Sequence, residues 1–209
     1  QARTLRQRGQ LARRRGHFDL AEPCYAAALT LLKAAATSSA CADESPHLLL
    51  HMATLANDRG DREQAEMLGQ QALAQARLLK QPSLLINILT QLAAAAGFRG
   101  KFDETKSHLN EAMNLAQSLP DTRHSAFLHL GLGFLASWTG DVIEAERQFE
   151  QTVAFAKQHE QREIASIARA LQGWVATNLG DYDRAISLSN EGLPLIREGS
   201  FCESVGLLY

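Results

Sequence analysis

Apolar and small residues recur along the chain at intervals of three and four, the spacing that places side chains on one face of an α-helix. One such series comprises Ala65, Leu68, Ala72, Leu73, Ala76 and Leu79, and a second comprises Leu109, Ala112, Met113 and Ala116. The chain has no alternating run of apolar and polar residues of the length that a strand needs. The pattern therefore predicts an all-α protein.

Glycines divide these helical segments at a regular period. Four of them are 40 residues apart and a fifth comes 44 residues earlier: Gly16, Gly60, Gly100, Gly140 and Gly180. Glycine can end a helix in a left-handed conformation that would cost another residue about 1 kcal/mol or more. An aspartate follows three of the glycines, at Asp61, Asp141 and Asp181, where it can accept from the free amides of the next helix. Each glycine therefore predicts a turn between two helices.

Small residues mark three further positions of every period. Seven residues before the glycines lie Gly9, Ala53, Ala93, Gly133 and Gly173. Five and twelve residues after them lie Ala21, Ala65, Thr105, Ala145 and Ala185, and Ala28, Ala72, Ala112, Thr152 and Gly192. Small side chains let two helices cross closely, so each period predicts a tight antiparallel helix pair.

The expected pairs cover residues 2–35, 46–79, 82–118, 121–158 and 161–197, and a truncated helix covers 200–209. Residues 37–45 are expected to form a polar insertion that lengthens the first period. One pair cannot bury its apolar face alone, so we expect residues 1–209 to form a single array.

This pattern resembles the tetratricopeptide repeat (TPR) family over essentially the whole chain. The residues that carry the likeness are the small residue before the turn, the turn Gly180-Asp181-Tyr182 and the two later small positions. The resemblance implies a right-handed α-solenoid of about five helix pairs and the start of a sixth. The common repeat has about 34 residues. The longer period looks like that of MalT-like sensor arrays in large LuxR-type regulators and related signal-transduction ATPases, where it implies an effector- or partner-binding array.

Composition agrees with a folded chain and excludes several classes of protein. The 209 residues are 45% hydrophobic with a formal net charge of −2, unlike a disordered chain. The apolar runs are too short to span a bilayer, and no signal segment opens the chain. Three cysteines, Cys24, Cys41 and Cys202, lack metal-ligand spacing and favour a reduced, cytoplasmic protein. The chain opens on Gln1, and we expect it to be a segment of a larger protein.

Aromatic residues occupy equivalent positions in the first helices of the later pairs. In TPR arrays the first helix of each pair lines the concave face, and offsets from the turn glycine select the residues that point into the groove. They include the aromatic residues Phe98, Phe127, Phe134, Trp138 and Trp174 and the polar residues Asn57, Asn87 and Asn178. Exposed rings in a groove are typical anchors for a peptide or apolar ligand. Rings packed between successive helices would instead belong to the core.

Six arginines precede residue 16 and leave the rest of the chain net acidic. Four of them are placed on the groove face by the same offsets, namely Arg3, Arg6, Arg13 and Arg14. They could bind a carboxylate or phosphate, or they could form the solvated or docking face of a terminal helix.

No catalytic or metal-binding constellation emerges from the sequence. His47 and His51 are four residues apart, but no third ligand follows at a diagnostic spacing. Neither a nucleophile elbow nor a phosphate loop is present. We therefore expect no enzyme activity, no metal and no cofactor.

Two functions remain. The chain is a non-catalytic sensor array of a larger bacterial signalling or transcription regulator, which binds a protein, a peptide or a small effector. Alternatively, it is a general protein–protein adaptor scaffold with no small-molecule ligand. A nucleic-acid-associated segment that uses the N-terminal arginines is a distant third hypothesis.

Overall fold

The computed structural model describes residues 1–35, 39–120 and 122–192. These ranges contain helices and connecting turns and no strand, which confirms the all-α class. The elements are α1 (Ala2–Arg14), α2 (Phe18–Ala34), α3 (Ser39–Asp58), α4 (Arg62–Leu79), α5 (Pro82–Phe98), α6 (Phe102–Gln117), the 3-10 helix η1 (Thr122–His124), α7 (Ser125–Thr139), α8 (Val142–Gln158), α9 (Arg162–Asn178) and α10 (Tyr182–Gly192). The truncated helix expected at 200–209, and the end of the fifth pair at 193–197, lie outside the described residues.

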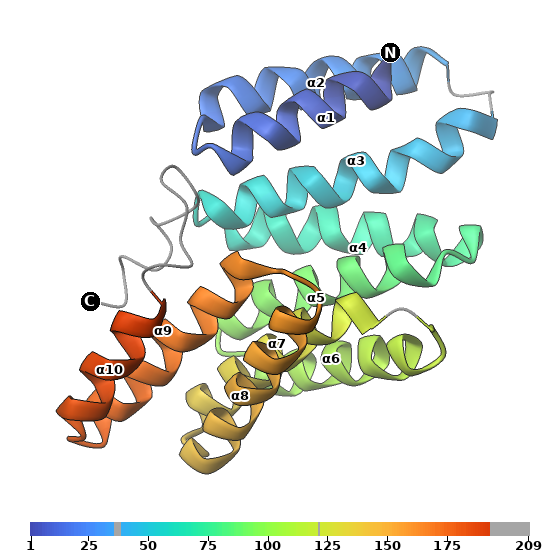
Figure 1. Ribbon diagram of the computed structural model, residues 1–209. Helices are drawn as coiled ribbons and strands as arrows, with labels where there is room; N and C mark the ends of the chain where they lie inside the picture. Colours follow the sequence, from blue (N-terminus) through green and yellow to red (C-terminus); the bar gives the residue numbers. More distant parts are fainter. Residues whose placement is uncertain (36–38, 121, 193–209) are drawn as a thin grey trace. The chain divides into compact units, whose positions relative to one another are not determined.

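The chain divides into two compact units, Gln1–Lys101 and Phe102–Tyr209. In the first unit α1 packs on α2 and α3 on α4, while α2 also contacts α3 and α4 contacts α5 (Figure 1). In the second unit α7 packs on α8 and α9 packs on α10. Helix α6 also contacts α7, and α8 contacts α9. Each unit is thus a stack of antiparallel helix pairs, and the expected third pair contributes α5 to one unit and α6 to the other. The single array over 1–209 remains a prediction.

The turns have the backbone conformation that the glycines predict. All five glycines are left-handed, with φ between 75° at Gly16 and 81° at Gly60. The amide of the residue after the glycine donates back to the last helical turn, as from Asp141 N to Ala136 O at 2.9 Å. The Asp141 side chain in turn accepts from the amide of Glu144 at 3.1 Å. The turn therefore closes one helix and caps the next within a few residues.

Two of the small residues make room for a large ring within their own helix pair. A Cβ added at Gly9 would lie 2.5 Å from Tyr25 Cε1, and one added at Gly133 would lie 2.5 Å from Phe149 Cδ1. Both rings are almost completely buried. Each glycine lies seven residues before a turn and each ring nine residues after it, so the same contact recurs in two pairs. Close packing of the two helices depends on it.

Two expected helix starts were wrong. Helix α3 begins at Ser39 rather than near residue 46, so most of the supposed polar insertion is helical. Glu44 in that segment forms an ion pair with Arg6 of α1, and this tertiary contact favours the helix over a loop despite the polar composition. Helix α7 begins at Ser125 rather than at residue 121, because η1 precedes it. None of the described helices is both long and apolar enough to cross a membrane.

Candidate partner-binding site

Four of the five predicted groove rings lie on two adjacent helices of the second unit. Phe127, Phe134 and Trp138 are on α7, where spacings of seven and four residues place them on one side of the helix. Trp174 is on α9, which contacts α7 and carries it at the position equivalent to Phe134. We call these four residues the aromatic face. Phe98 ends α5 in the first unit, where it is 55% exposed.

The four rings differ in how far they are buried. Phe127 is 48% exposed and Trp174 is 37% exposed. Phe134 is half-buried and meets the buried Phe149 edge-on, with 6.2 Å between ring centroids. Trp138, also half-buried, stacks on Phe134 at 5.6 Å. Phe127 and Trp174 therefore present ring surface to solvent, while Phe134 and Trp138 connect that surface to the core.

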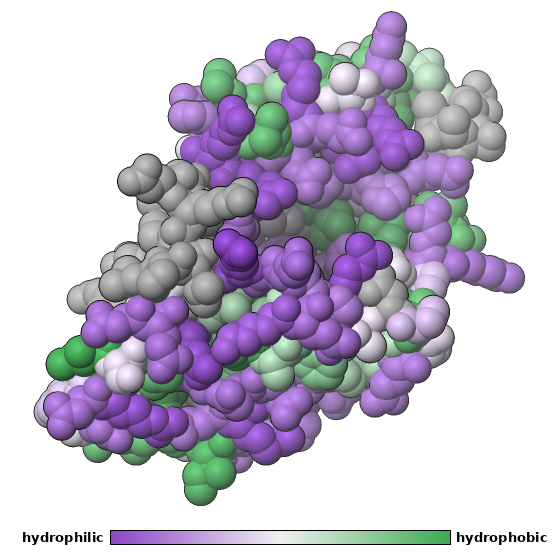
Figure 2. Space-filling model, viewed as in Figure 1, coloured by the Kyte–Doolittle hydropathy of each residue, from purple (hydrophilic) through white to green (hydrophobic). Residues whose placement is uncertain are grey.

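Of the two helices that carry the aromatic face, only α9 contains charged residues, namely Arg162, Glu163 and Arg169. Helix α7 contains no Asp, Glu, Lys or Arg. Neighbouring hydroxyls are satisfied by their own helices, because Ser137 Oγ donates to Gly133 O at 2.8 Å and Thr177 Oγ1 donates to Gly173 O at 2.9 Å. An apolar partner could therefore cover the rings of α7 without desolvating a charged group of that helix. Figure 2 shows that most of the visible molecular surface is hydrophilic, with smaller hydrophobic areas between.

The predicted polar groove residues have different environments. Asn57 is only 8% exposed. It donates to Gln91 Oε1 at 3.4 Å, and its Oδ1 accepts from Arg62 at 3.0 Å, so its role is structural. Arg62 also lies over the Phe98 ring, with 4.3 Å from its Cζ to the centroid. By contrast, Asn87 and Asn178 are exposed, as a groove residue must be. Asn178 donates one hydrogen bond, to Trp174 O at 3.0 Å.

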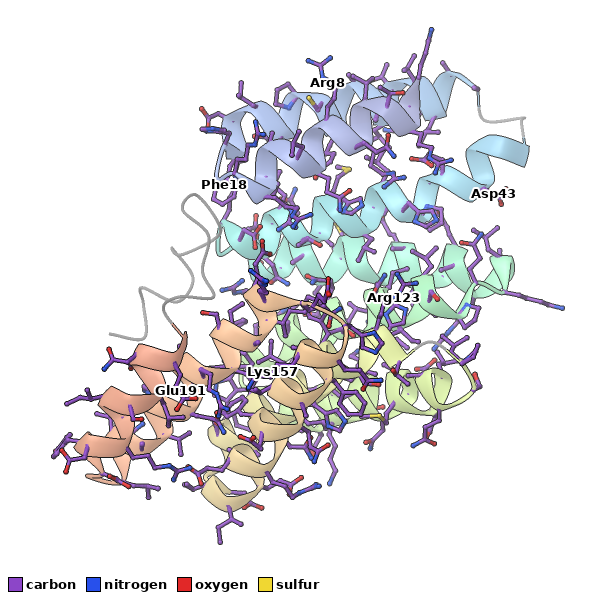
Figure 3. All side chains as sticks on the ribbon, in the orientation of Figure 1. Arg8, Phe18, Asp43, Arg123, Lys157 and Glu191 are labelled. Carbon is purple, nitrogen blue, oxygen red and sulfur yellow. The ribbon has the colours of Figure 1, made fainter. Side chains whose placement is uncertain are left out.

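Arg6 and Arg13, which were among the predicted anion-binding arginines, are bound within the protein. Arg6 pairs with Glu44, and Arg13 pairs with Asp58 at 2.6 Å. Side chains of α1 and α3 fill the space between these helices (Figure 3). Arg6 and Arg13 therefore link α1 to α3, which agrees with the docking-face alternative and not with side chains left open for an external anion. Arg3 and Arg14 are exposed, and an anion contact there remains a prediction.

The acidic partners of these arginines were not predicted from the sequence. Glu44 lay in the supposed insertion, where no helical offset applied to it. Asp58 was available as a signal, because it lies two residues before its turn glycine and Arg13 lies three residues before the preceding one. Opposite charges at adjacent offsets in neighbouring pairs indicate an ion pair between the two first helices.

The predicted His47 and His51 pair lies beside this network. The His51 ring stacks on Tyr25 at 6.4 Å between centroids, and its Nε2 lies 3.0 Å from Arg6 Nη1. Burial, with help from the Arg6 charge, lowers the pKa of His51 to about 3, and burial also lowers that of His47. His51 is therefore neutral at physiological pH and accepts a hydrogen bond from Arg6. Within the described ranges, no three His, Cys, Asp or Glu side chains gather as metal ligands.

The helices of each antiparallel pair are joined by a left-handed glycine turn, and the pairs stack on one another. This arrangement defines a helical-repeat protein of the α-solenoid class. Residues 84–158 of the chain match the tetratricopeptide repeat family. No curated protein matches the sequence.

Several solved structures share the fold. A Rap protein complexed with competence and sporulation factor has a TM-score of 0.82 at 19% identity, covering 91% of this chain and 52% of that one. The tetratricopeptide protein TTC0263 of Thermus thermophilus has a TM-score of 0.71 at 17% identity, covering 93% and 91%. BtubC from P. vanneervenii has a TM-score of 0.68 at 21% identity, covering 90% and 76%. The chain spans about half the length of the Rap protein. These likenesses confirm the α-solenoid class.

Proposed function

We propose that this chain is a non-catalytic binding segment that holds a protein or peptide partner on its aromatic face. The observation that carries the proposal is the exposed ring surface of Phe127 and Trp174, together with the absence of Asp, Glu, Lys and Arg from α7. Aromatic side chains supply much of the binding energy at protein interfaces. The likeness to a Rap protein that was solved with a bound factor supports the same use of the fold.

The length of the aromatic face favours a peptide over a small effector. Phe127 and Trp138 are eleven residues apart on α7, which corresponds to about 16 Å along a helix. That distance equals about five residues of an extended chain. A small effector would cover one or two of the rings, whereas a peptide can contact all of them.

The proposal extends to the protein in which this segment works. The 40-residue period supports a cytoplasmic, MalT-like sensor array in a larger bacterial regulator of signalling or transcription. A general adaptor scaffold is the alternative, and the TPR match supports it equally. The full-length protein discriminates between the two, because an ATPase phosphate loop or a DNA-binding domain elsewhere in it would favour the regulator.

Tryptophan fluorescence tests the aromatic face directly. The chain has two tryptophans, Trp138 and Trp174, and both belong to this face. Trp138 also stacks on Phe102 of α6 at 6.1 Å, so Trp174 is the indole that reports on the aromatic face alone. Apolar ten-residue peptides from a random library should change the emission and protect the indoles from acrylamide. Trp174→Ala should weaken the best peptide by about 2 kcal/mol, roughly 30-fold, while Trp174→Phe keeps most of the affinity. Peptides that bind equally well to Trp174→Ala and Trp138→Ala would refute the proposal.

A further inference from the structure

An ion pair joins successive helix pairs at equivalent places in the first unit. Glu22 of α2 pairs with Arg59 at 2.6 Å, and Glu66 of α4 pairs with Arg99. In both cases the glutamate lies six residues after one turn glycine and the arginine directly precedes the next. We call this interaction the seam clamp, because it bridges the second helix of one pair and the first helix of the next.

The seam between α6 and α7, within the second unit, lacks the residues of the clamp. Lys106 occupies the glutamate position and Thr139 the arginine position. The Thr139 hydroxyl donates to Leu135 O at 3.0 Å, within its own helix. Both residues line a pocket of about 380 Å³ between α6, α7 and the start of α8. At the next seam the equivalent acid, Glu146, pairs with Arg184 of α10 at 2.8 Å.

The pocket is lined by four apolar and six polar residues, and we call the polar residues the rim. Leu132, Leu135 and Ala136 of α7, together with Phe102 of α6, supply the apolar surface. The polar lining consists of Asp103, Lys106, Asn110, Thr139, Asp141 and Glu144.

The charges of the rim do not cancel. Hydrogen bonds from Arg147 and Gln148 lower the pKa of Glu144 to about 2, and the Arg147 guanidinium neutralises that carboxylate from 2.7 Å. The remaining charged residues of the rim are two exposed carboxylates, Asp103 and Asp141, and one cation, Lys106. Asp141 uses Oδ1 to cap α8, which leaves its other oxygen available to a ligand. The rim therefore favours a cation.

We propose that this pocket receives an arginine side chain of a protein partner. The methylene groups of the arginine would cover Leu132 and Leu135, and its guanidinium would lie against Asp103 and Asp141. Arginine suits a half-buried acidic site better than lysine does, because the guanidinium is planar and weakly hydrated. The partner would supply at this seam the arginine that the chain itself supplies, through Arg59 and Arg99, at two others.

Methyl NMR of the whole chain with labelled leucines provides the test. N-acetyl-arginine amide should shift the methyl signals of Leu132 and Leu135 with a millimolar Kd. N-acetyl-citrulline amide, which has nearly the same shape without the charge, should bind at least about fivefold more weakly. Asp103→Asn with Asp141→Asn should weaken the arginine derivative by a similar factor, and asparagine at 141 keeps the helix cap.

A repaired clamp supplies the decisive control. Lys106→Glu with Thr139→Arg places the chain's own arginine across the pocket, so the shifts caused by the arginine derivative should disappear while the thermal midpoint stays equal or rises. Lys106→Glu alone leaves the pocket open and removes its cation, so it should bind the derivative more tightly. Undiminished binding by the repaired variant would overturn the proposal. So would equal binding of the citrulline derivative, or no shift at about 50 mM.

Discussion

Gly133 and Gly173 hold the same place in successive helix pairs, yet we expect alanine to act differently at the two positions. A Cβ at Gly133 would lie 2.5 Å from Phe149 Cδ1, whereas the nearest atom to a Cβ at Gly173 is Ser189 Oγ at 3.3 Å. Carbon atoms pack at about 3.5–4.0 Å, so Gly133→Ala forces the Phe149 ring to move by about 1 Å. Gly173→Ala requires only a small adjustment of the serine.

The size of each effect follows from two opposing contributions. Alanine in place of glycine stabilises a helix interior by about 1 kcal/mol. Overpacking a rigid core costs about 1–3 kcal/mol, and Phe149 is fully buried. We therefore expect Gly133→Ala to lower the free energy of unfolding by about 1–2 kcal/mol. Gly173→Ala should leave it unchanged or raise it by up to about 1 kcal/mol.

Urea denaturation followed by circular dichroism measures both variants, and a double-mutant cycle identifies the cause. In a Phe149→Leu background the ring atoms that collide with the new methyl group are absent. Gly133→Ala should therefore cost less there than in the wild type, with a coupling energy above about 0.5 kcal/mol. Equal stabilities of Gly133→Ala and Gly173→Ala, or additive effects in the cycle, would refute the packing argument.

Three further predictions address a turn, a buried histidine and the aromatic face. Gly100 has a φ of 75°, so Gly100→Val should destabilise the protein by more than about 1 kcal/mol in the same assay; an unchanged midpoint would contradict this. Burial lowers the pKa of His51 to about 3, so between about pH 6.5 and 3 the unfolded chain binds a proton that the folded chain does not. Stability from this group is therefore lost as pH falls, by at most about 1.4 kcal/mol per pH unit. From pH 7 to 5 the wild type should lose stability relative to His51→Gln, and a constant difference would show that His51 is not held neutral. Trp138 stacks on Phe134 and Trp174 is more exposed, so thermal unfolding should show a loss of about 2–3 kcal/mol for Trp138→Ala and a smaller loss for Trp174→Ala; the reverse order would contradict the assigned burial.

The helices and turns could be predicted from the sequence because their determinants act over a few residues. A left-handed glycine such as Gly140 and a capping aspartate such as Asp141 satisfy backbone groups at most five positions away. The small residues at fixed distances from these turns indicated close helix crossings, and Gly133 against Phe149 shows one of them. Local chemistry repeated at a constant period was therefore sufficient for the helix pairs.

Contacts between different helix pairs were harder to predict from the sequence. The start of α3 and the role of Arg6 depend on Glu44, which is 38 residues away along the chain and has no offset from a turn glycine on an expected helix. The period shows that two positions are equivalent, but it does not show which side chain meets them.

The aromatic face shows this limit at a single position. Phe134 and Trp174 both lie six residues before a turn glycine, so the repeat pattern predicts the same environment for both. Phe134 is half-buried because the large Phe149 ring meets it edge-on. At the position of Phe149, the next pair has Ser189, which has no ring to pack, and Trp174 remains 37% exposed. Periodicity determined where the aromatic side chains stand, whereas their exposure was decided by the volume of the residue that the tertiary structure places opposite each one.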